Sequence, residues 1–221
     1  MNRSASLVAF CFASAVLIAG PSAAQSPHTM DHGFSGAEQW AKSFDDPKRD
    51  ASQKPGEVID ALALKPDSVI ADIGSGTGYF AVRLARMVPK GRVYGVDIEP
   101  DMVKYLAERA DRESLKNLNA LMGTPTDPRL PEKADLIVMV NVFHHIADRE
   151  RYFRNLRGSL KPGGRIAIID HNMDSREGPP QSARIAPERV KAELKSAGYA
   201  FVQEHVFLPA QYFLVFRPDR S

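Results

Sequence analysis

Three glycines at alternate positions, Gly74, Gly76 and Gly78, form the stretch of the chain best suited to bind a ligand. They follow a run rich in β-branched residues, Val69–Ile73, and precede a segment whose apolar residues recur at helical spacing. The pattern predicts a buried strand, a tight turn and a helix. Glycine permits positive φ and lets a ligand approach the backbone closely. Unpaired N–H groups at the start of the following helix favour a negatively charged group.

Two acidic residues stand at the ends of successive predicted strands. Asp72 comes just before the glycine turn, and Asp97 closes the next apolar run, residues 92–97. An acid at the end of that second strand can accept both hydroxyls of a ribose, as in other nucleoside-binding α/β folds. The dinucleotide fingerprint is absent, because Tyr79 and Ala81 stand where its third glycine would fall. The residues therefore predict a nucleoside site and argue against a nicotinamide oxidoreductase.

With Asp72 and the three glycines spaced as D-x-G-x-G-x-G, the sequence resembles the class I S-adenosylmethionine-dependent methyltransferases over about residues 55–217. The resemblance implies an α/β, Rossmann-like fold. In that fold a seven-stranded, mostly parallel sheet has one antiparallel strand, helices on both faces and an N-terminal helical cap. It also implies S-adenosyl-L-methionine as cofactor, lying over the ends of the first strands, with its methionyl end at the glycine turn.

The same resemblance extends the predicted cofactor site. Ile98 stands at a position that commonly packs on the adenine, and Asn141 would lie near the reacting centre. Thr124 stands where many relatives have an acid that contacts the adenine amine. Either the Thr124 hydroxyl replaces that contact or Asp127 supplies it.

Histidines are the candidate catalytic residues. A nearly uninterrupted apolar run over residues 135–141 predicts a central buried strand, which ends at the edge where ligands bind. His144 and His145 follow it, and His171 follows the next predicted strand. Adjacent histidines project in different directions, and no other spacing of His, Asp or Glu predicts a metal site. We favour His145, because the resembled pattern usually keeps a histidine there; a structural hydrogen-bonding role is the alternative for each.

The first 24 residues predict a signal peptide. Arg3 precedes an apolar stretch, residues 7–19, which is short for a membrane span, and small residues at 22–24 form a cleavage site near Ala24. We therefore expect a periplasmic or secreted protein with no stable membrane insertion after cleavage. Cys11 is the only cysteine and lies in this segment, so the processed chain has no disulfide or thiolate site.

The remaining chain predicts one domain. Residues 25–36 are expected to form a flexible linker, and residues 37–217 the methyltransferase domain, whose cap helices span 37–66. Within the cap, Arg49 and Gln53 are candidates to reach the pocket. In the linker, His28, Met30 and His32 could hold copper or zinc, but a polar linker is the preferred interpretation.

The balance of 29 basic and 27 acidic residues argues against nucleic-acid binding. The expected function is methyl transfer to a small-molecule acceptor that the sequence does not identify. The alternative is a catalytically silent domain that binds or senses the nucleoside in the cell envelope.

Overall fold

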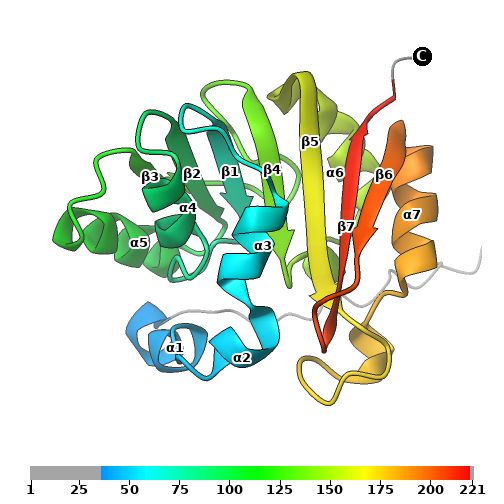
Figure 1. Cartoon of the computed structure of the whole chain (residues 1–221), viewed down its shortest axis with the longest axis horizontal. Helices are drawn as coiled ribbons and strands as arrows, with labels where there is room; N and C mark the ends of the chain where they lie inside the picture. The colour runs from blue at the N-terminus through cyan, green and yellow to red at the C-terminus, as the bar shows by residue number, and fades with distance from the viewer. Residues whose placement is uncertain (1–35, 220–221) are drawn as a thin grey trace, which may run out of the picture.

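The computed structural model describes residues 36–219 and contains one seven-stranded sheet with the order β3-β2-β1-β4-β5-β7-β6 (Figure 1). The strands are β1 (Val69–Ile73), β2 (Arg92–Asp97), β3 (Leu118–Met122), β4 (Ala134–Val140), β5 (Leu160–His171), β6 (Tyr199–His205) and β7 (Gln211–Pro218). Strands β1 to β5 pair in parallel, whereas β7 runs antiparallel to both of its neighbours. The predicted fold class is therefore confirmed, including the single reversed strand.

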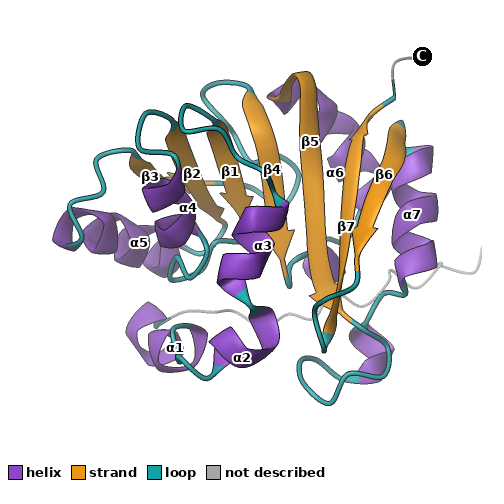
Figure 2. Cartoon of the chain, viewed as in Figure 1, coloured by secondary structure: helices purple, strands orange, loops and turns teal. Residues whose placement is uncertain are grey.

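Helices cover both faces of this sheet (Figure 2). They are α1 (Ala37–Phe44), α2 (Arg49–Gln53), α3 (Pro55–Ala61), α4 (Ala81–Met87), α5 (Pro100–Arg112), α6 (Arg149–Leu156) and α7 (Pro187–Ser196). Helices α3, α4 and α5 contribute to one buried cluster, and α6 and α7 to the cluster on the other face. Because the central strands are covered on both sides, β1 is buried at every position, as its continuous apolar run predicts.

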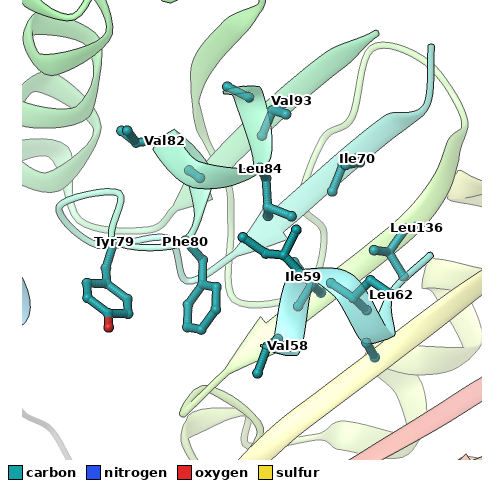
Figure 3. Close-up of a cluster of buried hydrophobic side chains, with 14 of the residues drawn as sticks. Val58, Ile59, Leu62, Ile70, Tyr79, Phe80, Val82, Leu84, Val93 and Leu136 are labelled. Carbon is teal, nitrogen blue, oxygen red and sulfur yellow. The ribbon is translucent and has the colours of Figure 1, made fainter. Parts of the chain in front are cut away.

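The core beneath α3 and α4 fixes the position of the first strand. Ile59 of α3, Leu62 just after it and Leu84 of α4 point towards Ile70 of β1 and Leu136 of β4 (Figure 3). Each such side chain contributes about 1.5–3 kcal/mol when it is fully buried. This packing fixes β1, the strand that the glycine turn follows.

Two local features shape the cap and the start of β5. Helix α2 begins at Arg49, shortly after α1 ends, where the Lys48 N–H donates to the Asp46 carboxylate. Helix α6 ends at Leu156 and is followed by a 3-10 helix, Arg157–Ser159. Residues 161–164 then turn within β5, where a register shift between Ala134 and Leu136 of β4 accommodates them.

The predicted signal peptide and all but the last residue of the predicted linker lie outside the described residues, as do His28, Met30 and His32. Over residues 36–219, no helix is long and apolar enough to cross a membrane.

Candidate functional site

The glycine turn connects β1 to α4 and is fastened to the end of β2. Gly74, Gly76 and Gly78 all have positive φ, at 70°, 53° and 93°. The N–H groups of Gly74 and Ser75 donate to the Val96 carbonyl, at 2.7 and 3.0 Å. The turn therefore has the backbone conformation that its spacing predicts, and it depends on β2 for its shape.

Two of these glycines also lie against side chains that leave no room for a methyl group. A Cβ on Gly74 would lie 2.3 Å from a methyl carbon of Val142, and one on Gly78 would lie 2.4 Å from Leu106. Glycine is required here for space as well as for backbone conformation.

Asp97 holds the turn through its carboxylate. Its Oδ2 accepts a hydrogen bond from the Gly76 N–H at 2.8 Å, and its Oδ1 accepts one from the Glu99 N–H at 3.0 Å. Burial raises the pKa of Asp97 from its ordinary value, although these N–H donors oppose the shift. A carboxylate at this strand end can accept further hydrogen bonds from a ribose, since each oxygen has two lone pairs.

Asp72 is more deeply buried, with 3% of its surface exposed. Burial, together with the nearby charge of Asp97, raises its pKa to about 7, against a hydrogen bond from the Ala81 N–H. Asp72 therefore lies under the turn, at the start of α4.

The cap covers the turn from the other side. Helices α1 and α2 lie at the edge of the sheet where β1 and β4 end (Figure 1). The Phe44 ring lies 3.4 Å from the position that a Cβ on Gly76 would occupy. Arg109 of α5 bridges the two parts, since its guanidinium donates to the Asp45 carboxylate at 2.7 Å and to the Thr77 carbonyl at 2.9 Å.

Of the two cap residues predicted to reach the pocket, Arg49 contacts the residue that follows the glycine turn. The Arg49 guanidinium lies 4.2 Å from the centre of the Tyr79 ring, in a cation–π contact. Gln53 is buried, and its Oε1 has no hydrogen-bond partner among the described residues. Ser75 Oγ and Thr77 Oγ1, both in the turn, are also buried without a partner within residues 36–219. Because buried polar groups are normally paired, the two hydroxyl groups in the turn fit a polar ligand there.

The residues predicted to contact the adenine differ in how available their side chains are. Ile98 is 53% exposed just beyond β2, so its side chain is available to pack on a flat ring. The Thr124 hydroxyl donates to the Asp127 carbonyl and accepts from the Asp127 N–H, each at 2.9 Å. The hydroxyl of Thr124 thus closes its own turn, and the Asp127 carboxylate accepts from the Arg129 N–H at 2.7 Å.

Asn141 lies at the end of β4 with a φ of 59°, a left-handed conformation that asparagine tolerates better than most residues. Its Oδ1 accepts a hydrogen bond from Gln211 Nε2 at 2.7 Å. The pair joins the end of β4 to the start of β7, so Gln211 is a site residue that sequence reasoning missed.

Of the two adjacent histidines, His144 has a fixed acidic partner. Its Nδ1 lies 2.9 Å from both carboxylate oxygens of Asp170, at the end of β5, and both side chains are 4% exposed. An aspartate on Nδ1 orients an imidazole and selects its tautomer, as in proteins that use histidine as a base. The ring of His145 lies against that of His144, with centroids 4.1 Å apart. The only sequence signal for Asp170 was its position at a predicted strand end.

His171 and the loop after β5 form the neighbouring wall. His171 is buried, and its Nδ1 has no partner in the described part of the chain; burial lowers its pKa. The Arg184 guanidinium makes many of the contacts that hold the loop, because it donates to the carbonyl groups of five loop residues: Asn172, Met173, Ser175, Glu177 and Pro179.

All the predicted cofactor residues and His145 thus come from segments that meet at one edge of the sheet, where the parallel strands end. Within residues 36–219, no group of three or more His, Cys, Asp or Glu side chains is placed to hold a metal ion.

Comparison with known proteins agrees with this geometry. A family model described as a methyltransferase domain matches residues 64–206. A S-adenosylmethionine-dependent methyltransferase from Aquifex aeolicus superposes with a TM-score of 0.75 and 27% identity, over 80% of this chain and 96% of that one. The chain belongs to the methyltransferase domain family, and the resemblance to class I methyltransferases is confirmed.

Curated relatives match over shorter parts of their length. A trans-aconitate 2-methyltransferase of Rhodopseudomonas palustris is 30% identical over 62% of this chain and 51% of its own. An arsenite methyltransferase of Halobacterium salinarum is 30% identical over 49% of this chain and 28% of its own. The chain thus spans about half or less of these two relatives. Their names differ in acceptor, so they do not identify one here.

Proposed function

We propose that the protein transfers a methyl group from S-adenosyl-L-methionine to a small polar acceptor. The observation that supports this most directly is the distribution of buried polar atoms without partners in the described chain. Ser75 and Thr77 contribute such atoms in the glycine turn, and His171 and Gln211 contribute them at the end of β5 and the start of β7. Gln211 also donates a hydrogen bond to Asn141 at the end of β4, which supports a polar site beside the turn.

The cofactor, when bound, supplies an already activated methyl group on a sulfonium. This chain would then contribute alignment more than acid–base chemistry, and alignment can lower a barrier by about 7–11 kcal/mol. Asp97 would bind the ribose hydroxyls, the turn would bind the methionyl end, and Ile98 would pack on the adenine. Thr124 would lie near the adenine amine and Asn141 near the reacting centre.

We also propose that the protein acts in the cell envelope after removal of residues 1–24. The basic and apolar pattern of that segment supports this. A fusion carrying residues 1–30 should cross the membrane and be trimmed near Ala24. An intact Met1 by mass spectrometry, together with cytoplasmic fractionation, would contradict the proposal.

Calorimetric titration with S-adenosylmethionine and with its demethylated product tests the cofactor assignment. Asp97→Ala should weaken binding by about 10- to 150-fold, the range for hydrogen bonds to a charged group. Asp111→Ala, which removes an exposed acid elsewhere, is the matched control. Equal affinities for the two variants would refute the role of Asp97. Binding without methyl transfer to any acceptor in a screen of small polar compounds would favour the silent binding domain.

His145 remains the proposed catalytic residue, with His144 and His171 as rivals. Loss of a general base costs about 100- to 10,000-fold in the chemical step, whereas loss of a merely aligning side chain costs less. Alanine variants of the three histidines should be compared on one acceptor. We expect His145→Ala to lower turnover most while cofactor affinity is retained. A larger effect of His144→Ala, with the fold intact, would assign the catalytic role to His144 in its pair with Asp170.

A further inference from the structure

A second concave surface lies at the opposite edge of the sheet, where β4 and β5 begin and β7 ends, away from α1 and α2 (Figure 1). The groove has a volume of about 780 Å³. Its wall carries five basic side chains: Lys133, Arg157, Lys161, Arg165 and Arg217. Asp219 is its one acidic residue. Since the formal charge of the whole chain is only +2, positive charge is concentrated here.

Most of this charge is not neutralised by the protein. Lys161 is paired with the Asp135 carboxylate at 2.7 Å. Arg157 and Arg165 donate to main-chain carbonyl groups, which satisfies N–H groups without cancelling charge. Lys133 and Arg217 are exposed and form no ion pair with any residue in the described range.

The groove also has room for a ligand beside these cations. A Cβ on Gly158 or on Gly163, both in the wall, would meet no atom within 4 Å. Several basic side chains from separate segments around an open space suit a compact anion of more than one charge. Arginine guanidinium groups match the oxygen geometry of a phosphoryl group.

We propose that this groove, here called the basic groove, binds a phosphoryl group. The group could belong to a free phosphate compound or to an anionic lipid headgroup, since both present the same oxygens. The site is distinct from the methyl-transfer site, because its residues lie where the parallel strands begin rather than where they end.

Two probes distinguish these sources: inorganic pyrophosphate, titrated by calorimetry, and vesicles of phosphatidylglycerol, compared with vesicles of phosphatidylcholine by sedimentation. Lys133→Gln combined with Arg217→Gln removes the two exposed cations, which have no hydrogen-bond or ion-pair partner in the described range. Gly158→Glu independently adds a negative charge to the wall, at a position with ordinary φ and free space. Lys90→Gln combined with Lys116→Gln is the control, since it removes two exposed cations outside the groove.

We expect binding of at least one probe by the unmodified protein. The double variant should lower that affinity by at least about tenfold, and Gly158→Glu should lower it as well, because charge-assisted hydrogen bonds are lost or opposed. Thermal unfolding and cofactor affinity should not change. Loss of pyrophosphate binding would identify a free phosphate site, and loss of vesicle binding alone a headgroup site. Absence of binding to both probes, or equal effects of groove and control variants, would overturn the proposal.

Discussion

The two edges of the sheet differ in charge and in how closed they are. Where the parallel strands end, the carboxyl groups of Asp72, Asp97 and Asp170 are buried or half-buried, and a helical cap lies beside the glycine turn. Where the strands begin, cations line an open groove. At the first edge the carboxyl groups bind backbone N–H groups and a histidine, so their role there is to stabilise the local structure. The second leaves two of its cations, Lys133 and Arg217, exposed and without ion pairs in the described range.

The strongest test of this difference is the buried pair at the strand ends. His144→Ala leaves the Asp170 carboxylate without its side-chain partner, and loss of one member of a buried pair typically costs about 3–5 kcal/mol of unfolding free energy. Asp170 retains the His171 N–H at 2.8 Å, so the lower part of that range is expected. The double variant His144→Ala/Asp170→Ala should recover part of the loss in chemical denaturation. Strictly additive losses would show that the two side chains are not coupled.

Asp72 provides the next largest effect, and it depends on pH. Because its pKa is raised to about 7, the folded protein retains a proton on this carboxyl group over a range in which the unfolded chain has lost it. The unfolding free energy should therefore fall as pH rises from about 4 to 7, by up to roughly 4 kcal/mol, and then level off. Asp72→Asn should remove this slope. If the unfolding free energies of the unmodified protein and of Asp72→Asn changed with pH in the same way, the raised pKa of Asp72 would be contradicted.

The glycine turn gives a smaller effect that separates conformation from space. Gly74→Ala should cost about 1–2 kcal/mol for its left-handed φ, with a further penalty from Val142. Gly76→Ala should show only the cost of the left-handed φ, because the nearest side chain, Phe44, would lie at ordinary contact distance from the new methyl group. Adding Val142→Ala should relieve only the Gly74 variant. Equal relief of both variants would argue against the clash.

The ion pair beside the basic groove should give the smallest effect. Although burial opposes it, hydrogen bonds from Lys161 and from the Val69 N–H lower the pKa of Asp135. The pair is partly exposed, so Lys161→Gln should cost about 0.2–1 kcal/mol, and less in high salt. A loss comparable to that of His144→Ala would remove the distinction between the two edges.

The sequence predicted the strands well because each has a simple signature. The apolar run of β1 and the acid that closes β2 both depend on local residues. The bounds of β1 and β2 were predicted without error. The turn within β5 could not be predicted, because its place in the strand depends on a register shift against β4.

The site was predictable only where function requires a backbone geometry. Glycine spacing indicates positive φ, and an acid at a strand end indicates a ligand edge. The Asn141–Gln211 contact joins residues 70 positions apart, so no local pattern could indicate it. Neither could the neighbouring sequence show that Asp170 would select His144 rather than His145 as its partner.

The loop held by Arg184 has a consequence for how acceptor preference can change during evolution. Arg184 binds the loop only through main-chain carbonyl groups, and these are the same whatever side chains the loop carries. Substitutions at Met173, Asp174 or Arg176 can therefore alter the side chains that the loop presents without removing the contacts that Arg184 makes with its main chain. Arg184 is constrained, whereas the side chains of the loop after β5 can change. The loop is therefore a natural place to begin laboratory evolution of acceptor preference.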